Sequence, residues 1–427
     1  MKEWNSFDKI IKGKGMWLID SKGNKMLDGV ASMWCNVWGH SNPELVRAIT
    51  NQSKKLQHSS MFNLTNEPAE RLAENLVNIS PGMHKIFFSD NGSTAMEIAI
   101  KLALQYWKNI GEKKKTKIAT IENGYHGDTF GAMSVGYVPE FFGKFKEQLF
   151  STIQFPVPNK YRIPKGFTFS DYQNYCIEKI EKKFSKNNNI AAFIMESGAQ
   201  VAGGVIIYPK GFQRKISQLC KKYDVLFVLD EIATGLGRLG SMIQYEEQKS
   251  TPDIVAYGKM LTGGYLTMAA TMTNKKIYDS YLGEFNDWKH LFHGHTYTGN
   301  PIAAAVANEN LKMYKTKSLI KKIQKTSKVF EKFYQEISEI DIVGDIRHKG
   351  MLMGIEIVTN RKKKTPIHPK KSINKIFFEE GKKQGIYLRT LGNIVMLVPP
   401  LAISEKELNL LLNRTIRTIK AARLKVI

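Results

Sequence analysis

Two charged side chains stand directly after apolar stretches that read as buried strands, and both could do chemistry there. Lys259 follows the run 253–257 and is bracketed by glycines. Removal from water and a neighbouring cation would lower its pKa toward the neutral amine that forms a Schiff base. Asp230 follows the run 225–229, where a carboxylate needs a positive partner such as a protonated pyridine nitrogen. Position alone also fits an ordinary lysine and an aspartate satisfied by local N–H groups.

A third segment has the residues of a phosphate site. Gly92 and Ser93 follow an apolar stretch, and Thr94 with Glu97 fits the spacing of a capping box. We therefore expect a helix N-terminus at Thr94. Its free N–H groups would face an anion, and the glycine would let that anion approach closely. An ordinary capped helix without a ligand fits the same residues.

A fourth segment places an aromatic ring near the same edge. Tyr125 and His126 lie between Gly124 and Gly127, shortly after the apolar run that ends at Ile121. The small neighbours leave the tyrosine ring free to lie against a planar ligand. An ordinary surface or core tyrosine is the alternative.

The elements that must position these residues form a regular pattern. Between about 85 and 300, apolar runs of strand length alternate with segments of helical period. Nearly continuous apolar strands separated by helices predict a mostly parallel sheet that is covered on both faces. Ligands of such sheets collect at the carboxyl ends of the strands, where all four segments would lie.

Both ends of the chain have a different pattern. Two short strands are expected at 15–20 and 25–29, while a long helix from 301 precedes further strands at 352–358 and 394–398. The fold class is therefore α/β, with a large domain and a smaller α+β domain formed by both chain termini. The boundaries that we predict are 1–47 and 301–427 for the small domain and 48–300 for the large domain.

Composition limits the classes of partner. The chain has 63 Lys and Arg against 39 Asp and Glu, a net charge of +24. The excess is mostly lysine spread along the chain, without the interleaved aromatic residues of RNA-binding motifs, so we expect a solvated surface and no nucleic-acid partner. No signal peptide or membrane-spanning apolar run is recognisable, which predicts a cytoplasmic protein without membrane contact. Three cysteines are too few and too scattered for a disulfide framework or a metal site.

One glycine pattern points elsewhere. Gly235, Gly237 and Gly240 match the GxGxxG fingerprint of dinucleotide-binding proteins. In that fingerprint the glycines follow the strand immediately, open a helix and precede an acid by about 20 residues. Here 230–234 intervenes and no acid lies near 260, so we discount a nicotinamide dehydrogenase.

The run 230–238, Lys259 and the run 293–300 together resemble class III aminotransferases of fold type I, and the similarity extends from about Gly13 to the C-terminus. The resemblance implies pyridoxal 5′-phosphate (PLP) as cofactor and a homodimer with active sites at the subunit interface. It implies that Lys259 carries the cofactor and moves the proton, that Asp230 holds the pyridinium nitrogen, and that Tyr125 stacks on the ring; these are the expected catalytic residues.

The resemblance also implies two sets of binding residues. The cofactor would be bound by Gly92, Ser93, Tyr125, His126, Asp230, Ile232, Lys259 and, from the other subunit, Thr296. The substrate would be bound by Trp34, Tyr125, Asp128, Arg238, Lys259, Gly294 and Arg389. Asp128 and Arg238 would form an ion pair beside the substrate, while Arg389 would pair with the substrate carboxylate through its bidentate fork.

Within the class, the runs 123–135, 103–107 and 32–34 resemble the enzymes of biotin biosynthesis that convert 8-amino-7-oxononanoate to 7,8-diaminononanoate. Their amino donor would be S-adenosylmethionine or lysine. Val201 departs from the family, which has glycine there, and it puts substrate affinity in doubt. The alternatives are an aminotransferase for an ω-amino acid, a diamine or ornithine, a basic binding module without catalysis, and an enzyme that binds PLP but turns over poorly.

Overall fold

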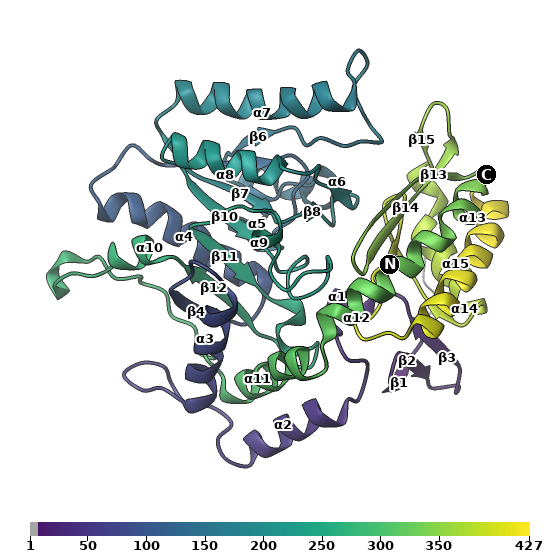
Figure 1. Ribbon diagram of the computed structural model, residues 1–427, viewed down its shortest axis with the longest axis horizontal. Helices are drawn as coiled ribbons and strands as arrows, with labels where there is room; N and C mark the ends of the chain where they lie inside the picture. Colours follow the sequence, from purple (N-terminus) through teal and green to yellow (C-terminus); the bar gives the residue numbers. More distant parts are fainter. Residues whose placement is uncertain (1–6) are drawn as a thin grey trace.

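The computed structural model describes residues 7–427, and its larger unit is built on a seven-stranded sheet (Figure 1). All neighbouring strands are parallel except β12, which runs antiparallel to both of its neighbours. In spatial order the strands are β4 (Lys85–Ser89), β12 (Ala269–Thr273), β11 (Ile254–Tyr257), β10 (Leu226–Asp230), β7 (Ile190–Glu196), β5 (Lys117–Ile121) and β6 (Ile153–Phe155). The expected mostly parallel sheet is confirmed.

The sheet is covered on both faces because its central strands are apolar along their length, except for the acids that end β7 and β10. In β10, Leu226 and Val228 pack with residues of α4 (Gly92–Asn109). Phe227 and Leu229, which point the other way, pack in a second cluster with α7 (Phe169–Lys186) and α8 (Phe212–Lys222). Alternation along a strand therefore supplies two hydrophobic layers from one apolar run.

The smaller unit, at the right of Figure 1, joins both ends of the chain. Strand β16 pairs in parallel with β3, so that Tyr387 lies opposite Asp28. The strands of this unit are β1 (Ile10–Lys14), β2 (Trp17–Asp20), β3 (Lys25–Asp28), β13 (Val343–Lys349), β14 (Leu352–Asn360), β15 (Thr365–Pro366), β16 (Ile386–Tyr387), β17 (Arg389–Leu391) and β18 (Ile394–Leu397). Helices α14 (Ile373–Lys383) and α15 (Glu405–Val426) pack on each other beside them.

Helix α11 (Pro301–Thr316) connects the two units and lies against the larger one. It packs on α2 (Pro43–Ser53) and α3 (Glu67–Ile79). Its buried Asn310 donates to the carbonyl oxygens of Met260 and Leu261 at 2.8 and 2.9 Å. The domain boundaries at 47 and 300 remain predictions, and this packing places α11 with the large unit.

The remaining elements are short or peripheral. They are α1 (Ala31–Trp34), α5 (Phe130–Val135), α6 (Pro139–Phe142), β8 (Ala199–Gln200), β9 (Ile206–Ile207), α9 (Gln244–Glu247), α10 (Lys275–Asp279), α12 (Leu319–Thr326) and α13 (Tyr334–Glu339). Within residues 7–427, none of the helices is both long and apolar enough to span a membrane.

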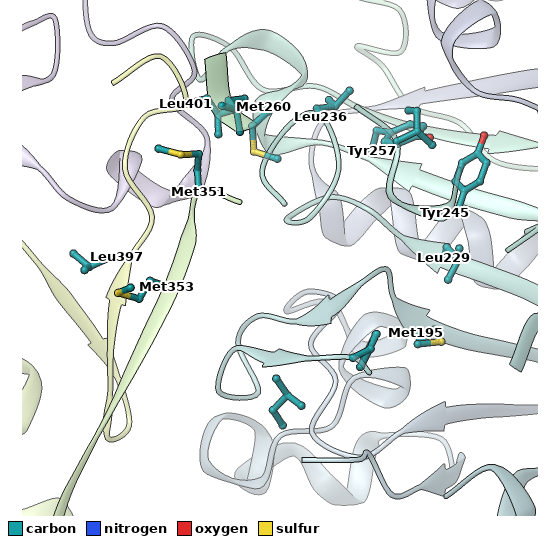
Figure 2. Packing of buried hydrophobic residues seen from close by; sticks show 14 of the residues in the cluster. Met195, Leu229, Leu236, Tyr245, Tyr257, Met260, Met351, Met353, Leu397 and Leu401 are labelled. Atoms are coloured by element: carbon teal, nitrogen blue, oxygen red, sulfur yellow. The ribbon is translucent and has the colours of Figure 1, made fainter. Parts of the chain in front are cut away.

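One hydrophobic core runs through both units. Figure 2 shows Met353 and Leu397 on small-unit strands, and they belong to the same cluster as Leu229 and Tyr257 of the large sheet. Met260, which follows Lys259 in the chain, is fully buried in this cluster. The backbone around Lys259 is therefore fixed by the contact between the two units.

Candidate active site

A cavity of about 720 Å³ opens at the carboxyl ends of the large sheet. Because β4, β5, β7, β10 and β11 run in the same direction, the residues that follow them meet at one edge. The predicted residues that line the cavity are Trp34, Gly92, Ser93, Tyr125, His126, Asp128, Asp230, Ile232 and Lys259. Arg238, Gly294, Thr296 and Arg389 do not line it.

Asp230 is buried at the end of β10 and is held in place by two contacts. Its Oδ1 accepts a hydrogen bond from the N–H of Ile232 at 2.9 Å, and its Oδ2 lies 2.8 Å from Nδ1 of His126. The His126 ring is also buried, and its Nε2 has no partner within residues 7–427. The carboxylate therefore has a fixed orientation inside the cavity.

Lys259 directly follows β11 and Gly258, and it lines the same cavity as Asp230. Burial lowers the pKa of its amine, while the nearby charges of Asp230 and Glu196 act in the opposite direction. Its Nζ lies 5.5 Å from the ring centroid of Trp34. A desolvated lysine amine is suited to attack a carbonyl carbon and to move a proton.

The helix beside these residues begins earlier than expected. Helix α4 starts at Gly92, and its capping box joins Asn91 to Thr94 instead of Thr94 to Glu97. The expected box is wrong because Glu97 accepts from Thr129 Oγ1 and Ala132 N on the neighbouring segment. The earlier start places the N–H groups of Gly92 and Ser93 in the first turn, and within residues 7–427 they have no hydrogen-bond partner.

Glycine is required at 92 because of its neighbour Ile232. A Cβ at this position would lie 2.9 Å from Ile232 Cγ2, which is closer than side chains tolerate. Gly127 similarly lets the Ser93 side chain approach, and Ser93 Oγ accepts from the N–H of Asp128 at 3.0 Å. A free pair of N–H groups at the start of an 18-residue helix forms an anion site.

Tyr125 lines the cavity and packs against neighbouring aromatic side chains. Its ring stacks on Phe142 with centroids 6.1 Å apart, and its hydroxyl donates to Asp128 Oδ1 at 3.1 Å. Partial burial, together with the Asp128 carboxylate, raises the pKa of Tyr125 above its usual value. The hydroxyl therefore stays protonated and acts as a donor.

The predicted ion pair between Asp128 and Arg238 is not formed in the part of the chain that the structure describes. Arg238 is fully buried in the turn after β10, and its Nη1 donates to the carbonyl oxygens of Met351 and Pro399 at 3.0 and 2.7 Å. Both acceptors belong to the small unit. The glycine-rich turn directs the Nη1 of this arginine to the junction of the units, while its charge still acts on the Lys259 amine.

The same turn lacks the strand–glycine–helix geometry of the dinucleotide fingerprint. Gly237 and Gly240 adopt φ values of 93° and 100°. The N–H of Gly240 returns to the carbonyl of Gly237 at 3.0 Å, and the next helix, α9, begins only at Gln244. The glycines therefore close a tight turn and do not open a helix.

Arg389 lies at the edge of the cavity, where it contacts Met33, one of the residues that line the cavity. Its Nη1 is 2.8 Å from Met33 Sδ, and its charge acts on the Tyr125 hydroxyl. Gly294 and Thr296 instead lie on the exposed segment before α11. The predicted contact of Thr296 with the cofactor would therefore need a second copy of the chain.

Glu196 is a buried acid whose place in the site was not predicted. It ends β7 and is the register partner of Asp230 in the sheet. Burial raises the pKa of Glu196 to about 7, and its carboxyl group accepts from the N–H groups of Tyr125 and Val201 at 3.3 and 2.9 Å. The apolar run that ends in this acid was the available signal, because it repeats the pattern before Asp230.

Val201 does not enter the cavity. Its side chain is buried with Trp34, Leu352 and Met396 between the units, and Ala202 lines the cavity in its place. The branched residue therefore adds apolar contact behind the site.

The residues present fit PLP. Asp230 supplies a fixed carboxylate for a protonated pyridine nitrogen, and Lys259 supplies a desolvated amine for a carbonyl carbon. The free N–H groups at the start of α4 suit a phosphate, and the missing Cβ of Gly92 lets Ile232 pack beside them at the cavity. No cluster of metal-binding side chains is present in the described residues.

Comparison with known proteins identifies the family. The sequence profile described as aminotransferase class-III matches residues 2–419. The chain is 43% identical over 403 residues to adenosylmethionine-8-amino-7-oxononanoate aminotransferase from Staphylococcus aureus, covering 93% of this chain and 88% of that protein. The protein of that name from Geobacter sulfurreducens is 39% identical over 427 residues, covering 98% and 94%.

Solved structures agree with this assignment. The crystal structure of adenosylmethionine-8-amino-7-oxononanoate aminotransferase from Methanocaldococcus jannaschii superimposes with a TM-score of 0.91 at 39% identity, covering 97% of this chain and 93% of that one. An omega transaminase from Pseudomonas jessenii in complex with PMP gives a TM-score of 0.93 at 29% identity, covering 98% and 94%. The chain therefore belongs to the class III aminotransferases and is a PLP-dependent transaminase of fold type I.

Proposed function

We propose that this transaminase converts 8-amino-7-oxononanoate to 7,8-diaminononanoate, the amination step of biotin biosynthesis, with S-adenosylmethionine or lysine as amino donor. The relatives and the solved structure that carry the corresponding name support this proposal over nearly the whole chain. The observation in the site that carries it is the lining of the cavity. Beside Lys259 and Asp230 stand the apolar side chains of Trp34, Met33 and Leu266, which suit an aliphatic chain with a ketone near one end.

When bound, PLP supplies the electron sink and carries the amino group between the two substrates. In the proposed chemistry, the Lys259 amine holds the cofactor and afterwards moves the proton at the reacting carbon. Asp230 keeps the pyridine nitrogen protonated, and His126 fixes the orientation of that carboxylate. Ile232 and Tyr125 would flank the cofactor ring, and the tyrosine hydroxyl donates to Asp128.

Two anionic groups need partners in this proposal. The N–H groups of Gly92 and Ser93 would bind the cofactor phosphate, with Thr296 reaching it from a second copy of the chain in a homodimer. Arg389 would pair with the carboxylate of the keto acid, because its fork matches two oxygens and it lies at the edge of the cavity. Gly294 would border the substrate from the second copy, and we expect the enzyme to work in the cytoplasm.

Product analysis tests the proposal. The PLP-loaded protein is incubated with 8-amino-7-oxononanoate and either S-adenosylmethionine or lysine, and the products are identified by mass spectrometry. Formation of 7,8-diaminononanoate with one donor is the expected result and names that donor. Absence of this product with both donors, although the protein turns over another amine, would refute the assignment.

A second candidate is an ω-amino acid or amine transaminase. Two observations favour it: the Pseudomonas jessenii omega transaminase has a TM-score of 0.93, and a probable gamma-aminobutyrate transaminase from rice is 32% identical over 433 residues. The sequence identities are lower than those of the first group. Turnover of an ω-amino acid or a diamine in the same assay would establish this alternative.

A further inference from the structure

The segment that carries Trp34 into the cavity has an unusual backbone. Ala31, Ser32 and Trp34 adopt φ values of 48°, 60° and 67°, in the left-handed region that favours glycine. A residue with a side chain adopts this conformation at a cost in free energy, so the conformation persists only where the surroundings impose it. Three of them within four positions therefore need a strong local constraint.

Asp28 supplies that constraint. The N–H of Val30 donates to its Oδ1 at 3.2 Å, and its Oδ2 accepts from the N–H and Oγ of Ser32 at 2.8 and 3.2 Å. The ring Nε2 of His40 lies 3.1 Å from the same oxygen. The Asp28 side chain has no exposed surface, so these contacts replace all the water that the carboxylate loses.

His40 is itself fixed against the first strands of the chain. Its N–H donates to the carbonyl of Gly15 at 2.6 Å, and its carbonyl accepts from the Gly15 N–H at 3.1 Å. A Cβ at Gly13 would lie 2.6 Å from His40 Cβ, so glycine lets the histidine pack there. The segment 28–40 is thereby closed into a loop with the Asp28 carboxylate at its base.

The residues that this loop presents belong to the candidate active site. The Trp34 indole is buried beside Lys259, and the next residue back, Met33, is exposed at the cavity and contacts Arg389. Asp28 does not line the cavity. Its direct hydrogen bonds go to the loop that carries Trp34 and Met33, so the loop connects it to the cavity lining.

We propose that Asp28, with His40, is a positioning residue that holds the strained segment 30–35 and thereby seats Trp34 against Lys259. This proposal rests on the proposed function in one respect, namely that Trp34 and Lys259 take part in the reaction. Without the carboxylate, the segment relaxes from the left-handed region, the indole leaves the lysine amine, and Met33 no longer borders Arg389. Small displacements of positioning groups cost about 10–100-fold in rate.

The first test needs neither cofactor nor substrate. The protein has six tryptophans, so the emission of cofactor-free protein minus that of its Trp34→Phe variant isolates the Trp34 indole. The same subtraction is then made with Asp28→Asn present in both proteins. We expect the difference spectrum to shift to the red, because the Trp34 indole becomes hydrated. An unshifted spectrum would overturn the proposal, whatever the substrate of the enzyme is.

A matched control comes from the same small sheet. Asp20 is also buried at a strand end and accepts from the N–H groups of Lys22 and Asn24 at 2.9 and 2.8 Å, but it does not border the cavity. Asp20→Asn should leave the Trp34 difference spectrum unchanged. A shift as large as that of Asp28→Asn would show a general loosening of the sheet and would overturn the proposal.

The second test is a double-mutant cycle on kcat/KM. If Asp28 acts through Trp34, the double variant Asp28→Asn with Trp34→Phe loses no more than about the larger single loss, since coupled residues are not additive. A loss equal to the product of the single losses would overturn the proposal. If Asp28→Asn does not fold, His40→Gln takes its place in both tests, with the same outcomes deciding.

Discussion

The two sides of the cavity are built in different ways. On the cofactor side, Asp230 and Lys259 follow adjacent strands of one parallel sheet, and Asp230 lies opposite Ala256 in the register. On the side that we propose for the substrate, Trp34 in α1 lines the cavity, and Arg389 at the start of β17 reaches its edge through Met33. The position of a residue at the end of an apolar strand can be read from the local sequence, whereas loop and domain packing depend on contacts far along the chain.

The largest effect should come from the cofactor side. Lys259→Ala removes both the attachment point and the proton carrier, so we expect turnover to fall by at least about 10⁴-fold with the fold intact. Steady-state rates and thermal unfolding measure the two properties. Full activity of this variant would remove the lysine from the mechanism.

Asp230→Asn keeps the shape of the side chain but removes its charge. We expect kcat to fall by about 10²–10³-fold, the usual cost of losing one preorganised electrostatic partner. Glu231→Gln is the matched control, because Glu231 is a buried neighbour that accepts from Gln244 N and Tyr245 N and does not line the cavity. If kcat falls by the same factor in both variants, the loss comes from changing a buried acid, and the proposed contact with the pyridinium nitrogen is contradicted.

Arg389→Ala tests the substrate side. Loss of a charged hydrogen-bonding partner should raise KM for the keto acid by about 10–100-fold, with a much smaller change for the amino donor. Substrate-dependent initial rates separate the two constants. Equal losses for both substrates would contradict the proposed pairing with the carboxylate.

Arg238→Lys distinguishes a role in substrate binding, which the sequence suggested, from a role in joining the two units, which the structure indicates. Because Arg238 bonds two carbonyl groups of the small unit, we expect its loss to lower the free energy of unfolding by about 1–3 kcal/mol. KM for the keto acid should stay near the value of the parent protein. A raised KM without loss of stability would show that Arg238 takes part in substrate binding.

The smallest effect should be a change in pH dependence. The folded-state pKa of Glu196 is raised to about 7 from an ordinary value of 4.5, so the folded protein binds more protons than the unfolded chain between these values. Stability should therefore fall as pH rises from 4.5 to 7, by roughly 1–3 kcal/mol more in the parent than in Glu196→Gln. Chemical denaturation at a series of pH values measures the difference, and parallel curves would contradict it.

The sequence predicted that the residues of the cofactor side gather at the carboxyl ends of the sheet, because Asp230 ends one apolar strand and Lys259 lies two residues after the next one. Their roles toward the cofactor stay predictions. The mostly parallel sheet and the joined chain ends followed from the same patterns. The position of Arg238 was predicted wrongly, since a glycine-rich turn changes direction in ways that residue spacing does not determine. Glu196 was missed although its apolar run is visible in the sequence, because that run does not show that its strand pairs with the strand of Asp230.

The most direct test of the account follows the visible absorption of the PLP-loaded protein, in the parent and in Lys259→Ala. The parent should lose its cofactor band when S-adenosylmethionine or lysine is added and recover it on addition of 8-amino-7-oxononanoate. The variant should show no such cycle. A cycle that persists in Lys259→Ala would contradict the mechanism. A parent protein that responds to neither donor, and only to an ω-amino acid or a diamine, would contradict the substrate assignment.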